Sequence, residues 1–581
     1  MLRISEIKLP LDYTEEDLKL KAAKFMKVQP SDITSLTVFR RSVDSRKKQD
    51  VHFVFTIDVE VNADEKRILK RSDKRRVQPS VFYHYVPVEN KRTSDFRPIV
   101  VGFGPAGMFC ALTLAEAGLR PIVLERGHDA DTRTKDVRDF WKNRSLNTSS
   151  NIQFGEGGAG TFSDGKLTTG IKDPRQNKIM TDFVRFGAPE AILYTNYPHI
   201  GTDNLVEVVK NIRKEIIRLG GEVRFGCTLT DLIIANRYIH GVTYREESGA
   251  TVDLETDCVV LALGHSARDT VTMLYNKGIQ MMQKPFSVGA RIEHPREFID
   301  RAQYGEAAGH PNLGAANYKM ACHPPHGRGM YTFCMCPGGT VVNAASEEGG
   351  IVVNGMSEYA RDAENSNSAL LVGIEPEHFP NEHPLSGFDL QRQMEQKAFE
   401  LGGKDYTAPA QLVGDFLADR KSTKMGAVRP SCPTGVSPSD IREVLPKSVT
   451  GIMAEALIDG QPCPVCGSIH HPQKAQRMET TPTEEAVRQA ERAAADARNR
   501  ASRASADAAQ ILGVVQARAE AIRKAGETLL NLTDPSVISQ KTVDRIQAEE
   551  QLLDEMKDKI QAAQNKMFRK EKLEKEIPDA E

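Results

Sequence analysis

One stretch of the chain limits its fold more than any other. Residues 97–127 read RPIVVGFGPAGMFCALTLAEAGLRPIVLERG. A short β-branched run is followed by G-x-G-x-x-G, then by a helix-like spacing that ends at Gly118, then by a second apolar run that ends at Glu125. This order predicts two parallel strands joined by a helix. The fold class expected is therefore α/β, with a Rossmann-type domain that binds a dinucleotide.

The residues of this unit have separate predicted roles. Gly102 permits a tight turn, Gly104 lets the backbone approach a pyrophosphate, and Gly107 lets the helix pack close to the sheet. The start of the helix offers free N–H groups and a positive dipole end to the phosphates. Glu125 can accept hydrogen bonds from ribose hydroxyls. The alternative is a glycine-rich turn in an ordinary α/β unit. The cofactor-binding residues predicted in this unit are Gly102, Gly104, Pro105, Ala106, Gly107, Glu125 and Arg126.

Composition limits the class of protein. A chain of 581 residues is long enough for several domains. Its formal charge of −2 gives no general reason to expect nucleic acid or a membrane surface as partner. No apolar run approaches the ~20 residues that span a bilayer, and the charged N-terminus lacks an apolar signal core. Nine cysteines, an odd number, argue against a disulfide framework. The expected location is the cytoplasm.

The region before this unit shows patterns of strands, a helix and a basic stretch. Residues 1–95 predict a small α+β module, with strands at 4–9, 36–40 and 52–61 and a helix from about 15 to 26. The basic stretch 66–76 is interpreted as a solvated face or linker, with a phosphate or nucleic-acid contact as the alternative.

The region after the unit predicts further elements of the same domain. Residues 204–219 predict an amphipathic helix, and three short strands are expected at 222–225, 228–235 and 239–245. Residues 257–264 (DCVVLALG) predict a fully buried strand that returns to the Rossmann sheet and ends at Gly264.

A glycine-rich loop follows the second apolar run. Residues 151–170 read NIQFGEGGAGTFSDGKLTTG, which is unfavourable for a helix or a regular strand. Residues 160–166 match the opening of a P-loop, but Leu167 stands where that motif needs a hydroxyl for Mg²⁺. We therefore expect the backbone amides of this loop to line a second face of the dinucleotide.

Taken together, these motifs resemble the bacterial FAD-dependent (NAD- or FAD-utilising) dehydrogenase family. The resemblance covers about residues 1–450 and continues at 285–289 (PFSVG), 332–340 (TFCMCPGGT), 346–357 (SEEGGIVVNGMS) and 367–373 (NSALLVG). It implies an FAD domain at 96–284 and an inserted mixed α/β substrate domain at 285–450. It also implies that Gly158, Gly160 and Gly264 approach FAD, and that a flavin transfers hydride for an undefined small-molecule substrate. Since only one dinucleotide fingerprint is present, either NAD(P)H as electron donor binds without a Rossmann unit of its own, or a different donor reduces the flavin.

Several further side chains are candidates for chemistry or ligand contacts. Cys334 and Cys336 form either a redox dithiol or two small core residues, which would share one face of a strand. A zinc site formed by Cys334 and Cys336 with Cys322, His323 and His326 is a weaker alternative, because the spacing fits no standard pattern. Contacts to phosphate or substrate are also considered for Lys166, Arg291 and His265. No catalytic residue is assigned.

The resemblance ends near residue 450, and a different pattern follows. Residues 451–480 contain C-P-V-C and resemble the zinc hook of SbcC, the coiled-coil subunit of a bacterial nuclease. That resemblance implies one zinc ion shared by Cys463 and Cys466 of two chains, with a nitrogen-ligated site or a metal-free turn as alternatives. In residues 481–581, small and apolar residues recur at spacings of four and three, which predicts a coiled coil. The implied partner is a second copy of the chain. The alternative function is therefore a zinc-hook interaction protein with a non-functional flavoprotein head.

Overall fold

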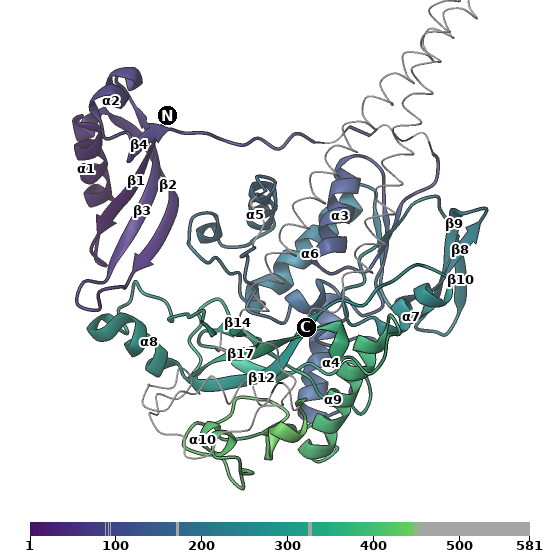
Figure 1. Cartoon of the computed structure of the whole chain (residues 1–581). Coiled ribbons are helices and arrows are strands. Elements are labelled where there is room, and N and C mark those ends of the chain that lie inside the picture. Colours follow the sequence, from purple (N-terminus) through teal and green to yellow (C-terminus); the bar gives the residue numbers. More distant parts are fainter. Residues whose placement is uncertain are drawn as a thin grey trace, which may run out of the picture. The chain divides into compact units, whose positions relative to one another are not determined.

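The computed structural model describes residues 1–446 and Val449, apart from residues 88, 91, 93, 170–172 and 323–327 (Figure 1). The predicted zinc hook at 451–480, with Cys463 and Cys466, and the predicted coiled coil at 481–581 lie outside the described residues. Within the described part, no helix combines the length and apolar character needed to cross a membrane.

The N-terminal module is an antiparallel sheet packed against a helix (Figure 1). Its elements are β1 (Leu2–Leu9), α1 (Glu15–Met26), β2 (Ile33–Asp44), β3 (His52–Val61), α2 (Glu65–Arg71) and β4 (Val77–Pro79). The sheet has the order β2-β3-β1-β4. Thr14 and Asp17 cap the first turn of α1 reciprocally, which is why the helix begins there. The basic stretch 66–76 begins inside α2, which buries Ile68.

A parallel sheet forms the centre of the predicted dinucleotide domain. Its strands are β5 (Ile99–Val101), β6 (Ile122–Leu124), β7 (Glu222–Arg224) and β11 (Val259–Leu261), in the order β11-β5-β6-β7. The helices of this region are α3 (Pro105–Glu116), α4 (Ala130–Asn143), α5 (Gln176–Arg185) and α6 (Thr202–Arg218). The apolar side predicted for α6 is buried, because five of its residues join the core beside α3.

A second, antiparallel sheet adjoins the first and contains two of the three predicted short strands, while the strand predicted at 222–225 is β7 of the parallel sheet. It has the order β10-β9-β8, with β8 (Cys227–Ala235), β9 (Tyr238–Glu246) and β10 (Thr251–Glu255), and α7 (Arg268–Asn276) follows β11. The strand predicted at 257–264 forms as β11 and returns to the parallel sheet beside β5, but the expectation that it is fully buried was wrong. β11 spans three residues, and Leu261 is 40% exposed, because β11 lies at the edge of its sheet.

The region after residue 285 has its own sheet, with the antiparallel order β12-β17-β14-β13. Its strands are β12 (Phe286–Pro295), β13 (Ala321–Cys322), β14 (Met330–Cys336) and β17 (Asn365–Ile374). Two smaller pairs are β15 (Thr340–Asn343) with β16 (Val353–Met356), and β18 (Ala408–Ala410) with β19 (Val436–Pro438). The helices are α8 (Arg296–Tyr304), α9 (Ser386–Gly402) and α10 (Val413–Leu417). Among the described residues, no strand after β11 joins the parallel sheet.

Candidate functional site

The glycines of the fingerprint meet three different steric demands. Gly102 follows β5 with φ +97°, and a Cβ there would lie 2.4 Å from the carbonyl oxygen of Ala262. A Cβ on Gly107 would lie 1.9 Å from the carbonyl oxygen of Gly102. At Gly104, by contrast, a Cβ would have the Cα atom of Gly158 as its nearest neighbour, at 3.7 Å. Close packing therefore requires glycine at positions 102 and 107. At position 104 a side chain would have room, and glycine there leaves the backbone accessible to a ligand.

The N-terminus of α3 presents donors at the same place. The first hydrogen bond of the helix runs from the Met108 N–H to the Gly104 carbonyl at 2.9 Å. Pro105 has no N–H, and helix geometry leaves the N–H groups of Ala106 and Gly107 without an intrahelical acceptor. These two donors and the positive end of the helix dipole suit the phosphates of a dinucleotide.

Glu125 ties three backbone segments together. Its carboxylate is 4% exposed and accepts hydrogen bonds from the N–H groups of Phe103 at 2.7 Å, Gly127 at 2.9 Å and Gly155 at 3.0 Å. A carboxylate can accept about four such bonds. Oε2 receives only the Phe103 bond in the described part, so it retains capacity for the predicted ribose hydroxyl.

The glycine-rich loop packs directly on the fingerprint. The Gly157 N–H donates to the Phe103 carbonyl at 2.9 Å. A Cβ on Gly158 would lie 2.9 Å from the Cα atom of Gly104, and one on Gly160 would lie 3.6 Å from Cγ of Pro105. The structure therefore brings Gly158 and Gly160 to the fingerprint.

A buried arginine on α4 holds this loop, and the sequence analysis missed it. Arg133 is 0% exposed and donates to the carbonyls of Asn151 at 2.8 Å, Ile152 at 2.9 Å and Glu156 at 2.7 Å. Burial lowers the pKa of Arg133 to about 10, against the opposing effect of nearby carboxylates, so the side chain stays cationic at neutral pH. Since α4 carries several charged residues, no local pattern distinguishes Arg133 from the others.

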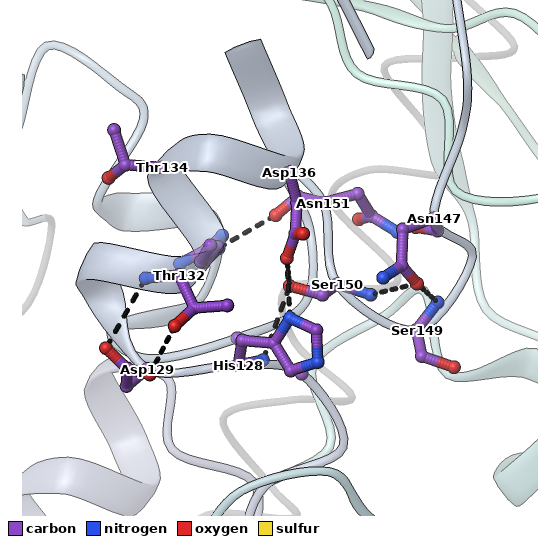
Figure 2. A network of polar contacts seen from close by, with 12 residues as sticks. His128, Asp129, Thr132, Thr134, Asp136, Asn147, Ser149, Ser150 and Asn151 are labelled. Carbon is purple, nitrogen blue, oxygen red and sulfur yellow. Dashed lines mark hydrogen bonds and ion pairs between the residues drawn. The ribbon is translucent and has the colours of Figure 1, made fainter. Parts of the chain in front are cut away.

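Figure 2 shows a second set of contacts that joins α4 to the start of the loop. Asp136 accepts a hydrogen bond from Ser150 at 2.5 Å and pairs with Nδ1 of His128 at 2.6 Å. Nε2 of His128 lies 3.1 Å from Glu247. Burial by itself lowers the pKa of His128, but the bonds to the two carboxylates outweigh it, so this pKa is raised.

Arg126 borders a cavity beside the fingerprint. Its guanidinium donates to Asp269 and to Thr270, both at 2.8 Å, and lies 4.4 Å from the ring centre of Phe154. The cavity has a volume of about 300 Å³. Its lining comprises Arg126, Thr148, Ser149, Phe154, Thr228, Arg245, Ser266, Asp269, Ser346, Glu347 and Glu348.

The other predicted residues fall into two groups. Gly264 follows Ala262, which touches Gly102, and no atom lies within 4 Å of a Cβ built on Gly264. His265 hydrogen-bonds to Ser266 at 2.9 Å, and burial lowers its pKa. Lys166 and Arg291 instead meet at the cysteines of β14.

The expectation that Cys334 and Cys336 share a strand face in regular alternation was wrong. Phe333 pairs with Ala369 but Cys336 pairs with Asn367, so β14 holds one extra residue. Such a bulge disrupts alternation, and Cys334 adopts φ +47° within it.

The predicted zinc alternative in the second half of the chain involves residues of β13 and β14 and two histidines between them. Cys322 lies in β13, whereas His323 and His326 are outside the described residues. Among the residues that are described, no three His, Cys, Asp or Glu side chains are grouped to hold a metal ion.

Comparison with known proteins gives two matches to family models. Residues 285–461 match the family described as FAD-dependent protein, C-terminal domain-like. Residues 1–60 match a domain of unknown function.

Solved flavoproteins show a weak likeness. A glycerol-3-phosphate dehydrogenase of Bacillus halodurans, complexed with FAD, is 11% identical over 49% of each chain, with a TM-score of 0.25. A flavoprotein/dehydrogenase of Cytophaga hutchinsonii is 14% identical over 49% of this chain and 59% of that chain, also with a TM-score of 0.25. The chain thus spans about half of each structure, and TM-scores of this size carry no argument about function.

A curated relative is much more similar. An uncharacterized protein of Clostridium beijerinckii is 46% identical over 463 residues, which cover 79% of this chain and 85% of the relative. The chain therefore belongs to the family of this clostridial protein, and its residues 285–461 match the model of the C-terminal domain of FAD-dependent proteins.

Proposed function

We propose that the chain is an FAD-dependent oxidoreductase. The observation that carries this proposal is the junction of the fingerprint with the glycine-rich loop. Gly104 and Gly158 face each other without side chains, beside the N-terminus of α3. A bare backbone next to unpaired N–H groups is what a diphosphate needs for close approach. The family match of residues 285–461 supports FAD as the dinucleotide.

The proposed binding mode assigns roles to residues of this chain. Ala106 and Gly107 donate backbone N–H groups to the diphosphate. Oε2 of Glu125 accepts from the adenosine ribose, while its other bonds keep Phe103 and Gly155 in place. Arg126 and Phe154 border the cavity that suits the adenine end. When bound, FAD supplies hydride transfer, so the reaction needs no side-chain nucleophile.

The substrate proposed is a small molecule, and NAD(P)H is the proposed electron donor. The sequence contains one dinucleotide fingerprint, which FAD would occupy. NAD(P)H would therefore reach the flavin from a surface that is not a second Rossmann unit.

The direct test is the visible absorption spectrum of the purified full-length chain, before and after addition of FAD and then of NADPH without oxygen. We expect flavin bands that bleach on reduction. A colourless protein that does not take up added FAD would contradict the proposal. Flavin bands that do not bleach with NADPH would contradict NAD(P)H as the electron donor but not the binding of FAD.

Gly104→Ala tests the geometry of the proposed site. The added methyl group has room in the folded chain, but it occupies the bare backbone that faces the ligand. We expect FAD affinity to fall by about tenfold or more, equivalent to 1.4 kcal/mol. The matched control is Gly414→Ala in α10, where a Cβ meets no atom within 4 Å. Equal FAD affinity in both variants would show that FAD does not bind at Gly104.

Beside the flavoprotein function, we propose that the C-terminal region links two chains through zinc. This proposal rests on the C-x-x-C pattern at Cys463 and Cys466 and on the heptad-like spacing that follows. It concerns residues outside the described part of the chain.

A further inference from the structure

The two cysteines at the end of β14 lie among cationic and polar side chains that the proposed FAD site does not use. Nζ of Lys166 lies 3.7 Å from Sγ of Cys336. Arg291 donates through Nη1 to the Cys334 carbonyl at 3.2 Å and to Oδ1 of Asn367 at 2.5 Å. Asn367 is 0% exposed, and its Nδ2 has no hydrogen-bond partner among the described residues. A buried donor without a partner points to a ligand or to an anionic group that forms in a reaction.

The backbone around the two cysteines has an unusual conformation at Cys334 and a close approach at Gly355. The bulge in β14 places Cys334 at φ +47°, a conformation that residues other than glycine rarely adopt. On the opposite side, a Cβ on Gly355 would lie 2.4 Å from Nη1 of Arg291 and 2.9 Å from Sγ of Cys336. Strained backbone that the surrounding structure enforces is concentrated at functional sites.

The two thiols are electrostatically different. A hydrogen bond from the Cys336 thiol, together with the charges of Lys166 and Arg291, lowers the pKa of Cys334 to about 5. The same contact and complete burial raise the pKa of Cys336. Cys334 is partly buried and Cys336 is 0% exposed, so Cys334 is the more accessible of the two residues.

The other charged groups near the cluster leave this asymmetry in place. Asp164 lies 2.8 Å from Nζ of Lys166, but Arg361 also pairs with Asp164 through two hydrogen bonds. Burial raises the pKa of Asp164, and the Arg361 contacts outweigh it and lower this pKa. Burial and the charge of Arg361 lower the pKa of His199, so His199 adds no charge at neutral pH. Lys166 and Arg291 therefore remain the groups that stabilise a thiolate.

We propose that Cys334 and Cys336 form a thiol–disulfide exchange centre whose substrates are disulfides. The Cys334 thiolate attacks one sulfur of a disulfide, a mixed disulfide forms, and the first thiolate leaves. The Cys336 thiol then loses its proton and attacks Sγ of Cys334. The second thiolate leaves, and an intramolecular disulfide remains. The substrate gains the two electrons that the two cysteines lose, so the step needs no other oxidant.

The test uses the full-length chain without added FAD and with oxidised glutathione as the probe, so it does not depend on the proposed flavin site. Trypsin cleavage after Arg328 and Arg361 yields a peptide, 329–361, whose only cysteines are Cys334 and Cys336. We expect this peptide to become lighter by about 2 Da, without an adduct, because two hydrogens are lost. At about pH 6 the reaction of Cys334 should be roughly five- to tenfold faster than that of a cysteine with an ordinary pKa. Its rate should change little between about pH 6 and pH 8, where an ordinary thiol gains about a hundredfold in thiolate.

Two variants separate the roles of the thiols. Cys336→Ser keeps a hydrogen-bond donor but cannot attack the mixed disulfide on Cys334. The peptide should therefore retain one glutathione on Cys334. Cys334→Ser should form neither the adduct nor the disulfide at about pH 6, because the remaining thiol is protonated. Circular dichroism checks that both variants are folded, and the wild-type mass measurement stands without them. Separate adducts on both cysteines of the wild type, or a Cys334 rate that rises with pH as for ordinary thiols, would overturn the proposal.

Discussion

Arg133 is a charged side chain without contact to solvent, and three backbone carbonyls explain its burial. The planar guanidinium can serve all three acceptors at once, which an ammonium group cannot. Arg133 also lies near Glu125 and Glu156, whose charges it balances. One residue thus fixes the loop that packs on the fingerprint.

Replacement of Arg133 by methionine should therefore affect both stability and cofactor binding. We expect the free energy of unfolding to fall by about 3 kcal/mol or more, because buried carbonyls and carboxylates lose their partner. Urea-induced unfolding measures this change. Arg138→Met, on the exposed side of the same helix, is the control and should be nearly neutral. If both variants unfolded at the same urea concentration, the role assigned to Arg133 would be wrong.

Lys166 offers a test of the thiol cluster at the scale of one charge. In Lys166→Met, Cys334 loses a nearby positive charge that lowers its pKa, while Asp164 keeps its pair with Arg361. The pH at which alkylation of Cys334 reaches half its maximal rate should rise by about one unit. Iodoacetamide labelling of peptide 329–361 in the Cys336→Ser background measures this midpoint. The exposed Lys142→Met serves as control, and an unchanged midpoint in Lys166→Met would exclude an electrostatic role for Lys166.

At the scale of elements, regular patterns were sufficient where one face of an element is buried. The alternation along β3 and the apolar side of α6 match the observed strand and helix, because burial selects those residues. The predictions were wrong where the structure of a segment depends on the strands beside it. Burial of residues 257–264 was overestimated because sheet order, which places β11 at an edge, is not encoded in that segment. The bulge in β14 depends on its register with β17, which β14 alone does not specify.

The connection between α4 and the loop after it has a pH dependence that can be measured. The pKa of His128 is raised in the folded chain by Asp136 and Glu247. Its protonated form therefore stabilises the fold fully below the unfolded pKa of about 6.5, and this contribution is lost as the pH rises through the folded pKa. We expect His128→Gln to lower the thermal midpoint at about pH 6 and to have much less effect at about pH 8.5. The exposed His240→Gln is the control, and a pH-independent effect of His128→Gln would contradict this assignment.

For the whole molecule, the sequence pointed to the glycine-rich segments of the candidate site but not to the buried ion pairs and hydrogen bonds that connect them to the rest of the chain. The fingerprint and the glycine-rich loop carry glycines at close backbone approaches, and the structure places these two segments together, whereas a Cβ on Gly264 would meet no atom within 4 Å. No local sequence pattern distinguishes Arg133 or the Asp164–Arg361 pair. Arg361 lies far from Asp164 along the chain, so only the folded chain reveals their contact.

The two functions proposed for this chain can be measured separately. Two thiolates make half of a tetrahedral zinc site, so a site shared between chains requires one zinc per two chains. We expect half an equivalent of zinc per chain by elemental analysis, and dimers that a chelator converts to monomers in light scattering. Cys463→Ser should abolish both properties without loss of FAD binding. A chain shortened to end at residue 461, where the family match ends, should do the same.

The measured zinc content separates the alternatives. One equivalent per chain would indicate a site completed within the chain, with His470 and His471 as the nearest nitrogen ligands in the sequence. Monomers that contain no zinc and ignore the chelator would remove the zinc-hook proposal. Since Cys463 lies beyond the fingerprint and beyond residue 461, that outcome would leave the FAD proposal intact, whereas loss of FAD in the shortened chain would show that the two regions depend on each other.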